Sequence, residues 1–351
     1  MKLLVSALEH SANVHLRYLL QELGNEIELF GIFDASLGES IVDLRSTAIM
    51  GFVDALTKLR FFFRLKDQMV ELARDVDKVL LIDSSGFNLP LAKSLRKRYP
   101  DKEILYYILP QAWAWKKKRI PVLEKTITKL CSILPFEPSY YSSTAPIEYV
   151  GHPLLDEITV IKPNLTPTGV VTFMPGSRPG EIKKLMSIFK GVRSQIKCEA
   201  MLVIPPHFDE IKIKELYGDI SNFTITNEAH TTLARSDFAF ICSGTATLEA
   251  CLIKTPFVLV YIAKKLDYII GRALIKLEYA GLGNLLFLHK YKQPLHPEFI
   301  QDEVTVENLY NSYLKMDREK FFTDAGALHA LLKHGSAHRV SEIIKEKTIN
   351  A

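Results

Sequence analysis

Residues Val170 to Ile182 read V-V-T-F-M-P-G-S-R-P-G-E-I, which is a β-branched apolar run, then Gly, Ser, Arg and Gly, then the charged start of a helix. A strand, a tight loop and a helix in this order favour a bound phosphate, because N–H groups at a helix start are unpaired and the helix dipole attracts an anion. Arg178 adds a guanidinium that can contact a phosphate through two nitrogens. Nucleotide-binding sheets usually carry such a loop near the N-terminus, whereas this one opens at mid-chain. The stretch therefore predicts that a second nucleotide-binding domain begins here.

The sequence on either side alternates between apolar, strand-like runs and longer helical patterns, which is typical of βαβ units and parallel sheets. The expected strands are 2–7, 27–32, 78–83, 104–109, 130–134, 148–150, 170–174, 200–204, 223–226, 238–242 and 256–262. After Pro297 the pattern becomes helical. The stretches 151–153 and 162–169 are rich in residues that interrupt periodic structure, so they indicate a hinge and a linker.

Length and composition fit two domains. A chain of 351 residues, 48% of them hydrophobic, is long enough to bury two cores. We therefore expect an α/β fold in which two doubly wound, Rossmann-like domains, 1–160 and 161–320, face a cleft that holds the active site. A helical tail is expected over 321–351.

Charge and cysteine usage narrow the class of protein. The net charge is only +4, which gives no reason to expect a nucleic-acid surface. The four cysteines are scattered with no C-x-x-C pair, and the chain starts directly with a strand-like run. No uncharged apolar run reaches the length of a bilayer span. We therefore expect a reduced, cytoplasmic protein without a signal peptide, a disulfide framework or structural zinc.

A second loop of small residues follows the apolar run 238–242 and reads S-G-T-A-T-L-E-A over 243–250. Small residues let a ligand approach the backbone, and the serine and threonine hydroxyls can bond phosphate oxygens. Glu249 would lie one turn inside the following helix, where it can hold a ribose diol. An ordinary N-cap of a buried helix explains the same letters. Because both loops follow expected parallel strands, we favour one ligand that contacts both.

The stretch from Met50 to Met69 carries two apolar stripes at helical spacing, with cations between them. One stripe is Phe52, Leu56, Leu59 and Phe63, the other is Phe62, Leu65 and Met69, and the cations are Lys58, Arg60, Arg64 and Lys66. Apolar residues beside cations suit a segment that enters anionic lipid headgroups, so we expect a membrane contact here. The residues expected to make it are Phe52, Leu59, Phe62 and Phe63. Burial of both stripes in a two-layer core is the alternative.

Several motifs occur in one order along nearly the whole chain. They are P-Q-A-W-A-W-K-K-K-R (110–119), L-P-F-E (134–137), V-G-H-P (150–153), F-M-P-G-S-R-P-G-E-I (173–182) and C-S-G-T-A-T-L-E-A (242–250). With these motifs the chain resembles the lipid-A-disaccharide synthase family. The resemblance implies a GT-B glycosyltransferase that transfers 2,3-diacylglucosamine from UDP to the 6-hydroxyl of 2,3-diacylglucosamine 1-phosphate, with inversion. It also suggests a dimer that exchanges C-terminal segments. We expect action without metal or cofactor at the inner face of the inner membrane.

Inverting transfer needs a base that removes the proton of the acceptor hydroxyl. Asp83 ends the expected strand 78–83 and matches the family's proposed catalytic aspartate, which makes it the expected base. A helix-capping aspartate is the alternative reading. Glu9 is the second catalytic candidate, and both Glu9 and Ser11, in the loop after the first strand, match family positions that can hold acceptor or sugar hydroxyls.

The chain departs from the family pattern in this same region. The family's loop is glycine-rich, G-E-x-S-G-D, whereas Leu8, Ala12 and Asn13 occupy its glycine and aspartate positions here. Asn13 is still expected to bind substrate, although it lacks the carboxylate of the family's aspartate. After Asp83, Gly86 stands where relatives often have a second acid, while Asn88 persists and is expected to contact substrate.

The leaving UDP needs cationic or dipolar groups that accept its charge. The residues expected to contact the donor are Gly176, Ser177, Arg178, Ser243, Gly244, Thr245, Glu249, Asn284 and Gln301. Turn chemistry explains Asn284 equally well, and helix-surface polarity explains Gln301.

Two other classes of function stay open. One is a UDP-N-acetylglucosamine epimerase-like isomerase on the same scaffold, and the other is a non-catalytic UDP-sugar binder at a membrane. The D-x-D sequence at 75–77 is expected to be an ordinary turn rather than a metal site. His334 and His338 are four apart on an expected helix, but no third zinc ligand is evident.

Overall fold

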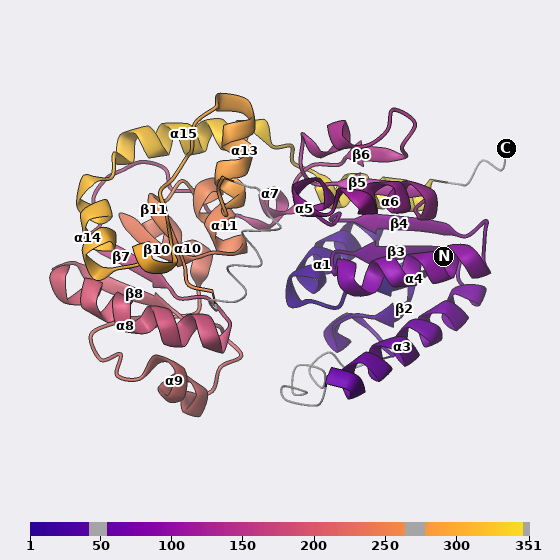
Figure 1. Cartoon of the computed structure of the whole chain (residues 1–351), viewed down its shortest axis with the longest axis horizontal. Coiled ribbons are helices and arrows are strands. Elements are labelled where there is room, and N and C mark those ends of the chain that lie inside the picture. The colour runs from indigo at the N-terminus through magenta and orange to yellow at the C-terminus, as the bar shows by residue number, and fades with distance from the viewer. Residues whose placement is uncertain (42–54, 264–277, 347–351) are drawn as a thin grey trace. The chain divides into compact units, whose positions relative to one another are not determined.

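The computed structural model of the chain describes residues 1–41, 55–263 and 278–346, which form two parallel sheets of six strands each (Figure 1). The chain divides into two units. Unit 1 comprises Met1–Glu157 and Leu332–Ala351, and unit 2 comprises Ile158–Leu331. The sequence suggested divisions near 160 and 320. Residues 332–346 thus return to the unit in which the chain starts.

The sheet of unit 1 has the order β2-β1-β3-β4-β5-β6. Its strands are β1 Lys2–Ser6, β2 Glu28–Ile32, β3 Lys78–Ile82, β4 Glu103–Tyr107, β5 Lys129–Ser132 and β6 Ile147–Tyr149. Its longer helices are α1 His10–Leu23, α3 Ala55–Leu72, α4 Ser85–Arg98, α6 Ile120–Thr126 and α16 Ser336–Lys345. From β1 the chain continues to β2 on one side, and β3 continues to β4 on the other, so the strand order reverses between β1 and β3. Open α/β sheets bind ligands outside the carboxyl ends of strands at such a point.

The sheet of unit 2 has the order β12-β11-β10-β7-β8-β9. Its strands are β7 Val170–Met174, β8 Glu199–Val203, β9 Thr224–Thr226, β10 Phe238–Cys242, β11 Phe257–Tyr261 and β12 Glu298–Ile300. Its helices are α8 Pro179–Gln195, α9 Glu210–Tyr217, α10 Ala229–Arg235, α11 Thr245–Ile253, α13 Leu282–Tyr291, α14 Val306–Lys315 and α15 Arg318–Leu331. The strand order reverses between β7 and β10. Both strands are buried along their whole length, as β-branched and aromatic runs inside a parallel sheet should be.

One expectation about unit 2 is wrong. The pattern after Pro297 predicts only helix, but Glu298–Ile300 pair with β11 as the edge strand β12. Three residues are too few to show the alternation that identifies a strand in sequence.

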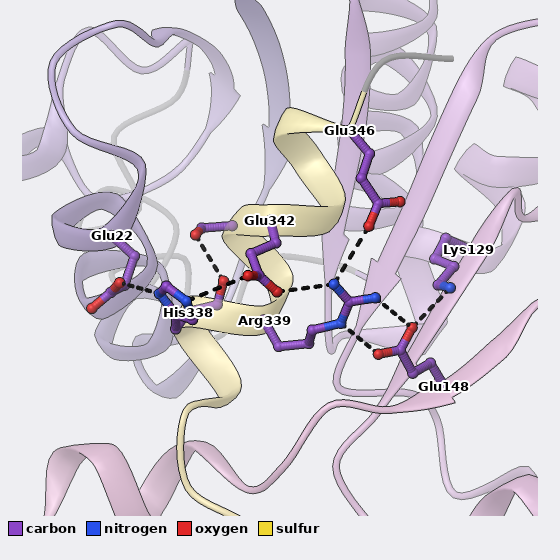
Figure 2. Close-up of polar contacts among 8 residues, drawn as sticks. Glu22, Lys129, Glu148, His338, Arg339, Glu342 and Glu346 are labelled. Carbon is purple, nitrogen blue, oxygen red and sulfur yellow. Dashed lines mark hydrogen bonds and ion pairs between the residues drawn. The ribbon is translucent and has the colours of Figure 1, made fainter. Parts of the chain in front are cut away.

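The C-terminal helix α16 completes unit 1. Its apolar face contributes Val340, Ile343 and Ile344 to the same core as the β1 residues Leu3 and Val5. Its polar face is fixed by Arg339, which contacts Glu148 of β6 through Nε at 2.6 Å and Nη2 at 3.1 Å (Figure 2). Glu342 and Glu346 bond the same guanidinium, and Lys129 bonds Glu148. Of the helical tail expected over 321–351, α16 is therefore a structural part of unit 1, whereas α15 belongs to unit 2.

Candidate active site

The loop after β7 needs glycine at position 176. Gly176 has φ +94°, and a Cβ atom there would lie 2.9 Å from Glu181 Oε2 and 3.2 Å from Cys242 Sγ. A side chain is therefore excluded both by the backbone conformation and by its neighbours. Since Cys242 ends β10, the close approach brings the loop after β7 against the start of the loop after β10. The two loops that the sequence singled out are thus neighbours at the reversal of strand order in unit 2.

Arg178 lies at the N-terminus of α8 with 78% of its side chain exposed. Its Nη1 contacts Glu181 Oε1 at 3.0 Å, and the Glu181 side chain is only 13% exposed. Within the described ranges, the Nε and Nη2 atoms of Arg178 make no hydrogen bond, so these donors are available to an anion. This geometry suits a bidentate contact with a phosphate group.

The loop after β10 presents its backbone and two hydroxyls at the surface. Gly244 and Thr245 are exposed and Ser243 is half-buried at the start of α11. The Thr247 hydroxyl instead donates to the Gly244 carbonyl at 2.8 Å, which shapes the loop from inside. Glu249, one turn into α11, lies 3.4 Å from His230 Nε2.

In unit 1, Asp83 follows β3 directly and is half-buried. Its backbone has φ +50° and that of Ser84 has φ +43°, so two consecutive residues with side chains adopt the left-handed conformation. The Ser84 hydroxyl donates to Glu9 Oε1 at 3.4 Å. Burial, and then the charge of Glu9, raise the pKa of the Asp83 carboxyl, while the Ser84 backbone N–H opposes the shift. The structure thus brings Asp83 and Glu9 together where strand order reverses between β1 and β3.

Two of the expected acceptor residues point into the protein. Asn13 is buried, with its amide donating to the carbonyls of Ala7 and Glu9 at 2.8 Å and its oxygen accepting from the Asp34 N–H at 2.7 Å. Asn88 is fully buried and contacts the backbone beside Asp83. Ser11 is half-buried in the first turn of α1. Asn13 and Asn88 therefore shape the loops that present Glu9 and Asp83.

Asn284 and Gln301, which the sequence predicted to contact the UDP-sugar, lie far along the chain from the loops at Gly176 and Ser243. Asn284 is fully buried: its amide donates to the His296 carbonyl and to Glu298, and its oxygen accepts from the N–H groups of Leu295 and His296. Gln301 follows β12 and lines a cavity of about 890 Å³. The cavity walls carry the acidic residues Glu278, Glu298, Asp302, Glu303, Asp317 and Asp324. Such acidic walls disfavour the binding of a diphosphate in this cavity.

Comparison with known proteins decides the family. A family model described as lipid-A-disaccharide synthetase matches residues 3–332. The chain belongs to the lipid-A-disaccharide synthase family. It is 46% identical to the lipid-A-disaccharide synthase of Helicobacter pylori strain J99, with 97% of each chain covered, and 42% identical to that of Campylobacter jejuni strain RM1221, with 98% and 99% covered. As a member of this family, the chain is a glycosyltransferase.

Solved structures agree on the fold of this lipid-A-disaccharide synthase family member. A putative UDP-N-acetylglucosamine 2-epimerase from Listeria monocytogenes superposes with a TM-score of 0.60 at 14% identity and covers 98% of this chain and 95% of its own. A calicheamicin glycosyltransferase superposes with a TM-score of 0.60 at 12% identity, covering 98% and 97%. This likeness shows the GT-B fold that the sequence predicted.

The D-x-D stretch at 75–77 and His338, which were not expected to bind metal, make structural contacts. Asp77 accepts from the Lys2 N–H at 2.7 Å where β1 and β3 begin, and His338 contacts Glu22 and Glu342. No three His, Cys, Asp or Glu side chains gather as a possible metal site within the ranges that the structure describes.

Sequence reasoning missed three residues that hold these loops: Glu181, which pairs with Arg178, and Tyr106 and Ser6, which contact the Asp83 turn directly or through Asn88. The charge spacing of Arg178 and Glu181, three apart at a helix start, could have indicated the first contact. Tyr106 carried no such signal because it reads as an ordinary buried strand residue.

Proposed function

We propose that this chain transfers 2,3-diacylglucosamine from UDP to the 6-hydroxyl of 2,3-diacylglucosamine 1-phosphate, giving a β-1,6 tetraacyl disaccharide 1-phosphate and UDP. The observation that carries the proposal is the family match over residues 3–332. The adjoining loops at Gly176 and Ser243 in unit 2 support a nucleoside diphosphate as the leaving group. The half-buried carboxyl group of Asp83 in unit 1 supports a base. Both tasks, binding the leaving group and accepting the proton, are assigned to residues of this chain and not to a metal or cofactor.

The reaction assigns one task to each region. Asp83 accepts the proton of the acceptor 6-hydroxyl while the oxygen forms a bond to the donor's anomeric carbon. The bond from that carbon to the β-phosphate oxygen breaks, and its electron pair leaves with UDP. Arg178 and the loops at Gly176 and Ser243 stabilise the charge that develops on the diphosphate. Attack opposite to the leaving group inverts the anomeric centre.

The direct test is to mix the purified chain with UDP-2,3-diacylglucosamine and 2,3-diacylglucosamine 1-phosphate in the presence of EDTA. Formation of the disaccharide 1-phosphate supports the proposal, including its independence of metal. Folded protein that forms no product with or without added divalent cations would refute it. Conversion of UDP-N-acetylglucosamine without any acceptor would instead favour the isomerase, and UDP binding without chemistry would favour the non-catalytic binder.

The pH dependence of turnover should depend on Glu9. A base works only when ionised, so turnover is lost as pH falls through the pKa of Asp83, which is raised above the ordinary value. Because the charge of Glu9 contributes to that rise, Glu9→Gln should move the acid limb of the kcat profile to lower pH. Glu22→Gln, at the other end of α1, should leave the limb in place. An unmoved limb in Glu9→Gln would show that Glu9 does not tune the base, and complete loss of turnover would make Glu9 the base.

We further propose that α3 contacts an anionic membrane surface. Leu65 and Met69 of this helix are buried in the core, whereas Phe62 and Phe63 are 40% and 54% exposed. Arg60 and Arg64 are exposed beside them. Phe52 and the Leu59 side chain lie outside the described residues. Exposed aromatic rings beside cations suit the headgroup region of a bilayer that carries the acylated substrates. Within the described ranges, no helix combines the length and apolar character that a membrane crossing requires.

Replacing the two exposed rings should release the protein from vesicles. Phe62→Glu with Phe63→Glu removes apolar contact area and adds two negative charges, so binding to vesicles that contain anionic phospholipid should weaken by at least about tenfold in a sedimentation assay. Leu314→Glu, at a 57% exposed position of α14 in unit 2, is the matched control and should bind as the parent does. Equal sedimentation of all three proteins would contradict a membrane role for α3.

A homodimer that exchanges C-terminal segments stays a prediction. In the chain described here, α16 packs against α1 of its own unit 1, with Val340 and Leu16 in one core.

A further inference from the structure

We infer that Tyr106 is a positioning residue for Asp83: its hydroxyl holds the main chain of the base in the left-handed turn that presents the carboxyl group. The inference rests on the proposed role of Asp83 as base. It adds a residue of β4 that does not touch substrate.

The turn itself calls for such a restraint. Asp83 and Ser84 have φ of +50° and +43°, and neither is a glycine. Residues with a Cβ atom rarely adopt this region, because the side chain approaches the carbonyl oxygen. Two in succession persist only where the surrounding structure holds them, and such strain gathers at functional sites.

The contacts around Asp83 show what holds it. The carbonyl oxygen of Asp83 accepts two hydrogen bonds, from Tyr106 Oη at 2.7 Å and from Asn88 Nδ2 at 2.8 Å. The N–H group of Asp83 donates to the Tyr107 carbonyl at 3.1 Å. Both polar groups of the Asp83 main chain are therefore fixed, and β4 contributes to each.

Asn88 extends the restraint to the neighbouring strand. Its amide also donates to the Ile82 carbonyl at 3.1 Å, and its oxygen accepts from Ser6 Oγ at 2.6 Å. Asn88 and Ser6 are both fully buried. The end of β1, the end of β3 and the start of α4 are thus joined through one side chain, beside the point where strand order reverses.

Tyr106 influences the reaction through the main chain of Asp83 and not by touching substrate. Its side chain is fully buried, so it cannot reach either substrate. Burial and the charge of Asp83 hold the pKa of its hydroxyl well above the usual range, so the hydroxyl stays a donor wherever the enzyme works. Loss of the hydroxyl would let the carbonyl, and with it the carboxyl group, move. Displacement of a reacting group by about 1 Å is enough to lower a rate by up to about 10²-fold.

The neighbouring tyrosine provides a matched control. Tyr107 is also fully buried on β4, but its hydroxyl bonds Ser336 Oγ of α16 at 2.8 Å, on the opposite face of the sheet. Tyr106→Phe and Tyr107→Phe therefore remove the same atom from the same strand, and each variant loses the hydrogen bond of that hydroxyl. Of the two, Tyr106→Phe is the variant in which Asp83 loses a contact.

The experiment compares kcat, KM for the UDP-sugar and melting temperature of both variants, with Asp83→Asn assayed alongside. Tyr106→Phe should lower kcat by about 10- to 100-fold with KM within about twofold of the parent, and Tyr107→Phe should keep kcat within about twofold. Full kcat in Tyr106→Phe overturns the inference, and so does an equal loss in both tyrosine variants, which would indicate general loosening of the sheet. If Asp83→Asn loses turnover as predicted and Tyr106→Phe keeps full kcat, only the inference fails. If Asp83→Asn keeps full turnover, the base assignment fails and the inference with it.

Discussion

Asp83→Asn should lower kcat by about 10²- to 10⁴-fold while the affinity for UDP stays within about twofold. The substitution keeps the size of the side chain and the strained main chain, which is held by Tyr106 and Asn88, but an amide cannot accept the proton of the acceptor hydroxyl. The loss should therefore fall on turnover and not on donor binding. Steady-state kinetics with both substrates at saturation measures it, and calorimetric titration with UDP measures the affinity.

Asp77→Asn is the matched control for this prediction. Asp77 lies immediately before β3, at the opposite end of the strand from Asp83, and its carboxylate accepts from the Lys2 N–H at 2.7 Å. The same chemical change there should alter kcat by less than about twofold, because an amide oxygen also accepts that hydrogen bond. Full turnover in Asp83→Asn would transfer the role of base to another group, with Glu9 the nearest candidate.

Removal of the Arg178 guanidinium should lower kcat/KM for the UDP-sugar by about 10²- to 10³-fold. The side chain is 78% exposed and bonded to Glu181 through one nitrogen, which leaves its other nitrogens available for the diphosphate that we propose binds here. In Arg178→Ala that charge is lost, and Glu181 is left as an unpaired anion at the phosphate loop. Both effects oppose the departure of UDP, and both should also weaken UDP binding.

Arg193→Ala makes the same change at the other end of α8. There the guanidinium bonds the carbonyls of Asn222 and Ile196, so its loss should reduce stability without altering kcat/KM. Arg178→Lys should recover part of the activity, since a lysine keeps the charge but not the paired nitrogens. Arg178→Ala with unchanged kcat/KM would mean that the diphosphate binds elsewhere.

Much of the fold could be predicted because buried parallel strands leave a clear signal. Val170–Met174 and Phe238–Cys242 are continuous apolar runs, and each is followed by small residues that a tight turn to a helix requires. The edge strand β12 was missed because three residues show no periodicity. The docking of α16 on unit 1 could not be predicted either, because an amphipathic pattern identifies a buried face without identifying what covers it.

The sequence located the two loops of the candidate site at the ends of parallel strands, but it did not identify the residues that support them. Gly176 and Arg178 stand out in sequence because loops that bind phosphate need those residue types. Asn13, Asn88 and Asn284 looked like ligand contacts, yet their amides are engaged by the protein backbone. The sequence does not distinguish a loop asparagine that contacts a substrate from one that bonds a buried carbonyl, because the fold determines where the side chain points.

Titration of UDP into the parent, Asp83→Asn and Arg178→Ala most directly tests the claim that unit 1 supplies the base and unit 2 binds the leaving group. The parent and Asp83→Asn should bind UDP equally, while Arg178→Ala should bind it at least about tenfold more weakly. Equal loss of UDP affinity in Asp83→Asn and Arg178→Ala, or equal affinity in all three proteins, would contradict that division.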